Sequence, residues 1–184
     1  MARTKLSKKG IVFITLSIIV VLSLVLVGVF VYTKTSSKSP LDLTLDFMNK
    51  YKNASNEVMN EVKYPYSDEL NDTQFNTYKD LIRSQYKSLT YQIVDEKVSE
   101  VDAIIKVDFD VFDYASSYDK ATSYLSLYGQ DMSLEKQVNY KLKAMSDTKE
   151  KITYSIEFKY YKLDGVWYML DVTTADLSKL TGTF

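Results

Sequence analysis

The sequence predicts an α+β protein in which one transmembrane helix precedes a curved four-stranded antiparallel sheet with helices on one face. Three observations predict this. An apolar run without a charged residue occupies residues 11–32. After it, segments with apolar residues every three or four positions are followed by segments that alternate every two. The resulting order is helices, hairpin, helices, hairpin, and one antiparallel sheet with helices on a single face satisfies it.

Residues 11–32 are expected to form the transmembrane helix. This run has 22 residues, and about 20 apolar residues are needed to cross a hydrocarbon core of about 30 Å. It is longer than the apolar core of a secretory signal peptide, and its end at Val27-Gly28-Val29-Phe30-Val31 offers no small-x-small cleavage site. The chain contains no cysteine, so a lipidated cysteine is excluded as the anchor. We therefore expect residues 11–32 to anchor the chain in the lipid bilayer, which is its first expected partner.

Charge predicts the orientation of this helix. The residues before the run are basic, and they include Arg3, Lys5, Lys8 and Lys9. Basic residues favour the cytoplasmic side, so residues 1–10 are expected to be a cytoplasmic tail. Residues 33–39 are then a linker, residues 40–175 an extracytoplasmic domain and residues 176–184 a C-terminal tail. The expected location is the plasma membrane, with a single pass and the N-terminus in the cytoplasm.

Composition excludes several classes of function for the domain. Beyond residue 33 the chain has 19 Lys and Arg against 24 Asp and Glu, so it carries a net charge of −5. A net negative domain is poorly suited to nucleic acid, because neutralising phosphates dominates that affinity. Cysteine and histidine are absent, which removes disulfides, thiol chemistry and ordinary zinc sites. No phosphate loop or nucleophile elbow occurs, so we expect no enzyme and no cofactor.

Helices are expected in two pairs, and the residues at their ends define them. Ser39 precedes a proline and can cap the first helix, which the Tyr64-Pro65 pair ends. Asn71 supplies the cap of the second helix. Gly129 ends the third, and Ser133 caps the fourth. The expected helices cover residues 41–62, 75–86, 118–128 and 134–145.

The strands follow from period-two alternation. The clearest strand alternates the apolar residues Ala103, Ile105, Val107, Phe109 and Val111 with mostly charged neighbours. It should pair with the preceding strand across Ser99-Glu100. Asp164-Gly165 is a strong hairpin signal for the last two strands. The expected strands cover residues 91–98, 102–112, 152–160 and 166–172.

Three of these segments carry a family resemblance. The runs LTYQIVDEKV at 89–98, AIIKV at 103–107 and DGVWYMLD at 164–171 resemble the NTF2-like (cystatin-like) domains of exported bacterial proteins, including small Gram-positive lipoproteins of unknown function. The resemblance covers residues 40–175. It implies a cup-shaped α+β fold and a location in the cell envelope. It implies no reaction, because enzymes, binding proteins and scaffolds all use that fold.

An acidic cluster in the second strand is a first candidate site. Asp108, Asp110 and Asp113 lie close together in the sequence. A calcium loop would contain glycine and more oxygen ligands, and alternate residues of one strand face are too far apart to chelate an ion unaided. We therefore favour a solvated strand face whose charges discourage edge pairing.

The outer face of the sheet is the second candidate, as an interaction face. Large apolar residues lie among its charges, and such a patch often marks a protein contact. Which side chains of 166–172 point inward stays open, because both faces of this strand are apolar. The candidate interaction face consists of Ile104, Phe112, Tyr161, Trp167 and Met169.

These observations predict a membrane-anchored extracytoplasmic protein that acts as a protein-interaction or assembly module of the cell envelope. Its expected partner is a second copy or another envelope protein. The alternative is a small-ligand or cell-wall-glycan binding module that uses the concave cup of the domain. A cup filled by aromatic side chains favours the first function, and an open cup with convergent polar groups favours the second.

Overall fold

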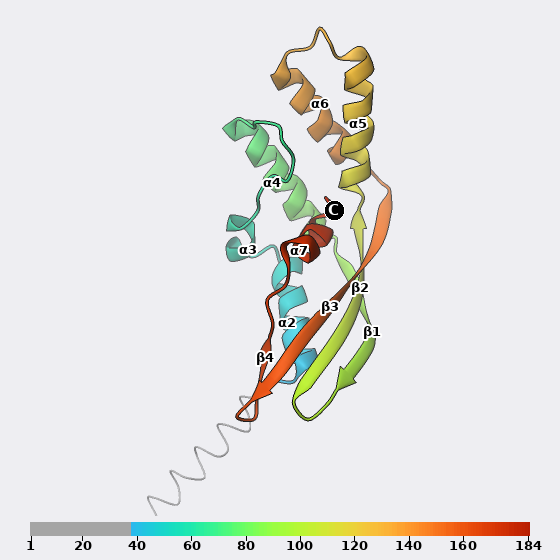
Figure 1. Cartoon of the computed structure of the whole chain (residues 1–184). Helices are drawn as coiled ribbons and strands as arrows, with labels where there is room; N and C mark the ends of the chain where they lie inside the picture. Colours follow the sequence, from blue (N-terminus) through green and yellow to red (C-terminus); the bar gives the residue numbers. More distant parts are fainter. Residues whose placement is uncertain (1–37) are drawn as a thin grey trace, which may run out of the picture. The chain divides into compact units, whose positions relative to one another are not determined.

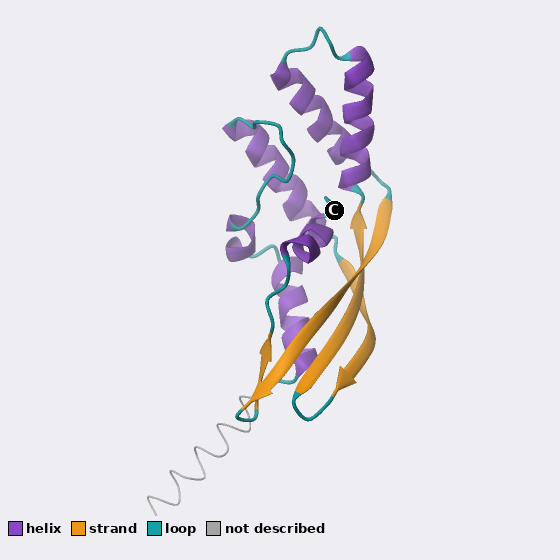
Figure 2. Cartoon of the chain, viewed as in Figure 1, coloured by secondary structure: helices purple, strands orange, loops and turns teal. Residues whose placement is uncertain are grey.

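A four-stranded antiparallel sheet is the centre of the chain in this computed structural model, which describes residues 38–184. The strands are hydrogen bonded in the order β1-β2-β3-β4. Helices cover one face of the sheet (Figure 2), so the predicted α+β class and the four antiparallel strands are confirmed. The strands are β1 (Thr90–Val98), β2 (Asp102–Phe112), β3 (Lys151–Leu163) and β4 (Val166–Met169).

The expected cytoplasmic tail, the transmembrane segment 11–32 and most of the linker lie outside the described residues. Within residues 38–184, no helix is long and apolar enough to cross a bilayer. Residues Ser39–Phe184 form one compact unit, and the expected boundary at residue 175 does not divide it.

Strand β2 shows the alternation that its sequence predicts. Its inward side chains are at most 2% exposed, and it pairs with β1 on one edge and β3 on the other. The register of β1 shifts between Ile93 and Asp95, so Val94 is displaced from the ladder as a bulge. Asp164 and Gly165 both have positive φ and join β3 to β4, as their sequence predicts.

The first expected helix is divided in two, which corrects the prediction of one helix over 41–62. The chain forms α2 (Pro40–Lys52) and α3 (Asn56–Asn60) instead. Asn53 ends α2, Ala54 adopts φ 46°, and the Ser55 side chain accepts a hydrogen bond from the backbone of α3. Asn and Ser side chains compete with helical hydrogen bonding, so this sequence ends one helix and caps the next.

The next three helices begin and end close to where the sequence predicts. Asn71 caps α4 with a reciprocal capping box, Ser133 caps α6, and Gly129 follows the last turn of α5. These helices are α4 (Asp72–Lys87), α5 (Tyr114–Tyr128) and α6 (Leu134–Asp147).

Residues 176–184, which we expected to be a tail, belong largely to helix α7 (Thr174–Thr181). Thr173 caps this helix, and Leu180 is fully buried in the core. Gly182 follows with φ 69°, and its carbonyl accepts a hydrogen bond from the backbone of Ala115. The segment is therefore an integral part of the fold.

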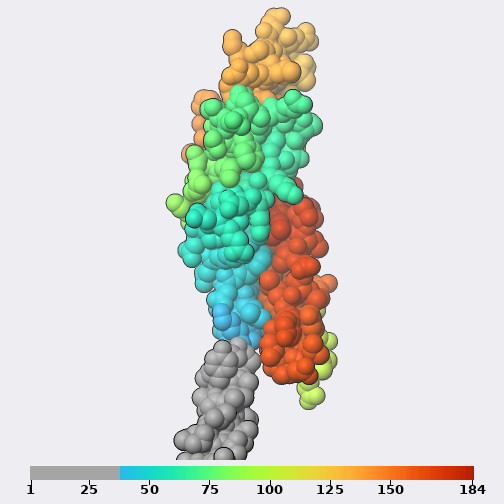
Figure 3. All heavy atoms as spheres, turned by 90° about the vertical axis from the view of Figure 1, so that its left-hand side faces the viewer, coloured from blue at the N-terminus to red at the C-terminus, as the bar shows by residue number. Residues whose placement is uncertain are grey.

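Two ends of the domain can be distinguished (Figure 1). The turn between α5 and α6 lies at one end, and the β1–β2 and β3–β4 turns lie at the other, beside the first turn of α2. Figure 3 shows the same arrangement, with the α5–α6 turn in orange at the top and the β1–β2 turn in yellow-green near the bottom. A hydrogen bond of 2.5 Å between the hydroxyls of Thr44 and Tyr160 joins α2 to β3.

We expect Gly182→Ala to destabilise the fold more than Gly165→Ala. Both glycines have positive φ, which costs a residue with a Cβ about 1–2 kcal/mol. A Cβ at Gly165 would have no atom within 4 Å, whereas one at Gly182 would lie 2.0 Å from the Phe112 carbonyl oxygen. Overpacking should therefore lower the free energy of unfolding by a further 1–3 kcal/mol, roughly, in Gly182→Ala. Urea denaturation would measure the difference, and equal losses would contradict it.

Candidate functional site

Two of the five residues of the predicted interaction face lie together on the outer face of the sheet. Ile104 and Tyr161 are 36% and 43% exposed. Tyr161 pairs with Tyr168 across the β3–β4 ladder, and their rings stack with centroids 5.3 Å apart. Tyr168 was not among the predicted residues, although it is as exposed as Tyr161.

Trp167 and Met169 lie on the opposite face, which corrects their assignment to the outer one. Met169 pairs with Tyr160, a residue that is 2% exposed, and residues that oppose each other across a ladder share a face. Both Trp167 and Met169 pack against the core. A shift of one residue in the pairing register of a strand moves every side chain to the other face. In an apolar strand such as β4, the sequence does not indicate which register forms.

Phe112 belongs to a junction between elements. Its ring packs against Tyr114 with centroids 6.1 Å apart, and the Lys151 ammonium lies 5.3 Å from the ring centroid. Its backbone N–H donates to the buried side chain of Gln85 in α4 at 3.0 Å. Its backbone and ring therefore both join the end of β2 to its neighbours.

Each carboxylate of the acidic cluster has a separate structural partner. Ser155 donates to Asp108, and Thr153 donates to Asp110 at 2.6 Å across the β2–β3 ladder. Asp113 caps α5 by accepting from the Ser116 backbone at 2.9 Å. The three side chains are thus divided between a strand face and a helix terminus.

A larger exposed apolar cluster lies around the α5–α6 turn, and we call it the hairpin patch. Leu134 is 80% exposed, Tyr128 70% and Leu127 69%. The Tyr124 ring lies 5.0 Å from that of Tyr128 and stacks on that of Tyr140 at 5.3 Å. The hairpin patch consists of Tyr124, Leu127, Tyr128, Met132, Leu134 and Tyr140.

The hairpin patch was not predicted from the sequence, although a signal was present. The buried face of α5 includes Tyr118, Ala121 and Leu125, at helical spacing. Leu127 falls outside that face, so a helical wheel leaves it exposed. Tyr128 continues the spacing of Ala121 and Leu125, but it is the last residue of α5 and is 70% exposed. A large apolar residue off the buried stripe, next to a turn, is the pattern that indicates such a surface.

A buried ion pair holds the α5–α6 hairpin to the loop before α4. The Lys141 ammonium donates to both carboxylate oxygens of Asp68, at 2.9 and 3.1 Å. Tyr118 and Tyr64 also donate to this carboxylate, at 2.6 and 3.2 Å. The side chains of Lys141 and Asp68 are 10% and 19% exposed. The network joins residues distant in the sequence and sets the position of the hairpin.

The network keeps both ions charged. Burial raises the pKa of Asp68, but hydrogen bonds from Tyr118 and Lys141 outweigh it, so the net pKa is lowered. Burial lowers the pKa of Lys141, and the contacts with Asp68 and Tyr118 outweigh that effect and raise it. A lysine and an aspartate that are each held in the charged form are suited to a structural link, and neither is poised to exchange a proton near neutral pH.

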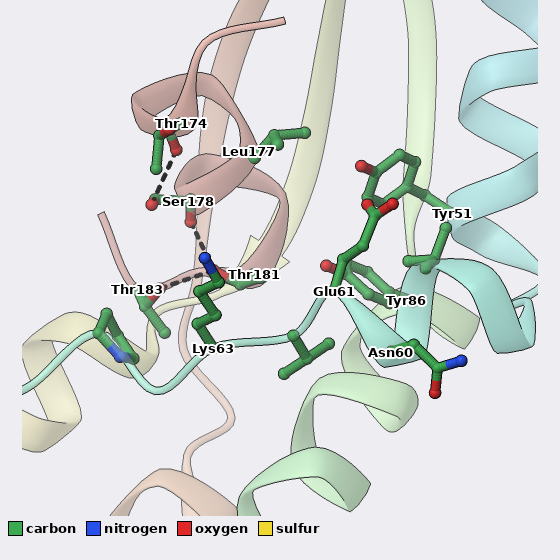
Figure 4. Close-up of a pocket in the computed structure, with 13 residues that line it drawn as sticks. Tyr51, Asn60, Glu61, Lys63, Tyr86, Thr174, Leu177, Ser178, Thr181 and Thr183 are labelled. Atoms are coloured by element: carbon green, nitrogen blue, oxygen red, sulfur yellow. Dashed lines mark hydrogen bonds between the residues drawn. The ribbon is translucent and has the colours of Figure 1, made fainter.

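A pocket of about 490 Å³ lies beside α7 (Figure 4). Figure 4 shows the carboxylate of Glu61 near the rings of Tyr51 and Tyr86, while Lys63 extends toward α7. Tyr51 and Tyr86 are 7% and 3% exposed, and no group within residues 38–184 forms a hydrogen bond with either hydroxyl. Chemically, Glu61 and the two phenols can accept hydrogen bonds from an ammonium group, and Lys63 can donate to an anion.

Burial and the nearby carboxylates keep these phenols protonated. Burial, followed by Glu61 and Glu57, raises the pKa of Tyr51 to about 12. Burial also raises the pKa of Tyr86, and the neighbouring Tyr51 adds to the effect. Both phenols are therefore neutral groups that can donate or accept a hydrogen bond at any physiological pH.

The concave side of the sheet is filled. The Phe47 ring of α2 packs edge-on against Phe158 of β3 with centroids 5.0 Å apart, and Tyr51 packs against Tyr86 at 5.4 Å. Phe109 and Phe158 are each 1% exposed beneath the helices. Aromatic side chains thus occupy the space of the expected ligand cup.

Comparison with known proteins gives one structural likeness. No protein-family model matches the chain, and no curated protein matches it. The chain is similar to a protein described as a lipoprotein, ycdA, from Bacillus subtilis subsp. subtilis str. 168, with 17% identity and a TM-score of 0.38. The likeness covers 80% of this chain and 47% of the other, so the chain spans about half the length of that structure. Similarity at this level carries no argument about function.

The stacked pair Tyr66 and Tyr118 provides a test of the ion-pair network. Their rings are parallel, with centroids 3.6 Å apart. The Tyr118 hydroxyl hydrogen bonds to Asp68 and Lys141, whereas the Tyr66 hydroxyl is buried without a partner. Tyr118→Phe should cost about 1.5–3 kcal/mol in the free energy of unfolding, because bonds to charged groups are lost. Tyr66→Phe should be neutral or stabilising by about 1 kcal/mol, because it removes a desolvated hydroxyl.

Chemical denaturation of the two variants would measure these changes. The variants differ from the parent by one oxygen atom each and keep the stacked rings. A cost for Tyr66→Phe equal to that for Tyr118→Phe would contradict the assigned network.

Proposed function

We propose that the chain is a non-enzymatic, single-pass membrane protein whose extracytoplasmic domain, of the NTF2-like type, binds another protein through the hairpin patch. The observation that carries the proposal is the gathering of three tyrosines, two leucines and one methionine around one exposed turn. Large exposed apolar clusters on soluble domains mark interaction sites. Tyrosine is also enriched among the residues that dominate binding energy at protein interfaces.

The proposed location is supported by the sequence. Residues 11–32 are long enough and apolar enough to span a bilayer, and basic residues precede them. The domain that follows is then outside the cytoplasm. The resemblance of residues 40–175 to exported NTF2-like domains supports the same location.

The geometry of the hairpin patch favours a protein partner over a small ligand. The Tyr124 ring stacks on that of Tyr140 and lies tilted against that of Tyr128, and all three are exposed, which suits a broad contact. Charged residues such as Asp131 and Glu135 adjoin it in the sequence, as in an interface with an apolar centre and a polar rim. The partner is a second copy of the chain or another envelope protein with an apolar surface.

In-cell crosslinking of the full chain tests this function. A photo-crosslinking residue at Ser126, beside the patch, should capture a defined partner. The double variant Leu127→Ser/Leu134→Ser should lose the crosslinked species, because it removes the two most exposed leucines of the patch. The matched control Val101→Ser/Leu163→Ser changes exposed apolar residues at the other end of the domain. This control should still form the crosslinked species.

Two outcomes would refute the proposal. One is a crosslinked species that survives Leu127→Ser/Leu134→Ser unchanged. The other is a domain that protease cannot reach in intact cells but can reach after lysis, because that result would reverse the proposed sidedness.

A second candidate function is binding of a small ligand with an ammonium group in the pocket beside α7. The phenols of Tyr51 and Tyr86 and the carboxylate of Glu61 favour it, because all three line this pocket and can accept hydrogen bonds from an ammonium group. This ligand would lie beside α7 and not in the concave side of the sheet, which aromatic side chains occupy.

Titration of the full chain in detergent with glucosamine tests this candidate. Glucosamine is an amino sugar with an ammonium group, and N-acetylglucosamine is its uncharged counterpart. We expect calorimetry to detect binding of glucosamine and no binding of N-acetylglucosamine. Glu61→Gln should lose the binding of glucosamine. Glu69→Gln should keep it, because Glu69 is in the same loop but outside the pocket. Equal binding of both sugars, or no binding of glucosamine, would exclude this ligand class.

A further inference from the structure

Two turns meet at the end of the domain where α2 begins. The backbone N–H of Lys162, near the end of β3, donates to the carbonyl of Val101 in the β1–β2 turn at 2.8 Å. Asp102 pairs with Tyr161 directly beside this bond. The β3–β4 turn at Asp164-Gly165 follows within a few residues, so both turns and the start of α2 share one end (Figure 1).

Exposed apolar side chains gather at this end, and we call them the turn patch. Val101 is 64% exposed, Leu163 55% and Val98 51%. The stacked Tyr161 and Tyr168 lie near the same end, on the outer face of the sheet. The turn patch consists of Val98, Val101, Tyr161, Leu163, Val166 and Tyr168.

The length of chain before α2 limits how far this end can be from the anchor. Seven peptide bonds separate Tyr32, the last residue of the apolar run, from Ser39, the cap of α2. Even fully extended, seven residues span at most roughly 25 Å. The bond between Thr44 and Tyr160 holds the start of α2 against β3, close to the turns. An anchored chain therefore keeps the turn patch near the lipid surface.

We propose that the turn patch contacts the outer surface of the lipid bilayer in which the chain is anchored. This inference depends on the membrane anchor of the proposed function. Aliphatic side chains such as Val101 and Leu163 would enter the boundary between headgroups and acyl chains, and the tyrosines would lie at headgroup level. The hairpin patch, at the other end of the domain, then faces away from the membrane.

Charged residues at the turns limit the depth of this contact. Glu100 and Asp164 lie at the tips of the two turns, and Lys162 lies between the turns. The Lys162 ammonium is 5.2 Å from the Trp167 ring centroid. Charges of both signs are compatible with headgroups and not with hydrocarbon, so the turn patch rests at the interface and does not insert deeply.

The absence of cysteine from the chain makes a site-specific test direct. Val101→Cys, Leu163→Cys and Leu127→Cys would each be labelled with an environment-sensitive fluorophore in the full chain, reconstituted into phosphatidylcholine nanodiscs. Leu127 is the matched control, because it is as exposed as Val101 but lies at the opposite end of the domain. Acyl chains brominated near the headgroup would then quench any label that reaches the interface.

We expect loss of fluorescence at positions 101 and 163 and none at position 127. Chain that incorporates into nanodiscs but shows no quenching at 101 and 163 would overturn the inference while leaving the anchor intact. Chain that fails to incorporate would overturn the anchor and the inference together. Disulfide formation between two copies of the unlabelled Val101→Cys, in place of quenching, would assign the turn patch to a second copy and also overturn the inference.

Discussion

The pairing of β2 with strands on both of its edges is the constraint on which the rest of the domain depends. Its inward side chains are almost completely buried and provide the surface on which α2 and α7 pack. Its register with β3 fixes which side chains of β3 point outward, and β3 in turn fixes those of β4. The outward position of Tyr168 and the inward position of Met169 follow from a register set two strands away.

A second set of contacts determines where the helical hairpin lies. The Asp68–Lys141 pair links the loop before α4 to α6, and the buried Gln85 links α4 to the end of β2 through the backbone of Phe112. A buried ion pair contributes little net stability, since desolvation offsets the attraction, but losing one partner is costly. These contacts hold the hairpin patch at the end of the domain opposite to the turn patch, so one rigid unit presents two apolar surfaces in different places.

The features that the sequence predicted depend on neighbouring residues. The caps at Ser39, Asn71 and Ser133, the alternation of β2 and the Asp164-Gly165 turn each need only a few adjacent positions. The faces of Trp167 and Met169 could not be predicted, because they depend on pairing between strands. Asp68 and Lys141 are 73 positions apart, and neither has a distinctive sequence context. Two features had local signals that apolar periodicity does not include. Asn53-Ala-Ser55 indicates the break between α2 and α3, and Thr173 with Asp176 indicates the start of α7.

Helix α7 has a consequence for how the domain is made. Leu180 is fully buried, and Gly182 is enclosed by the end of β2 and by α4. A ribosome synthesises these residues after every strand of the sheet. Part of the apolar surface of the sheet therefore stays uncovered until α7 has been synthesised and has packed against it. Truncated chains that lack this helix would be expected to be substrates for chaperones and quality-control proteases.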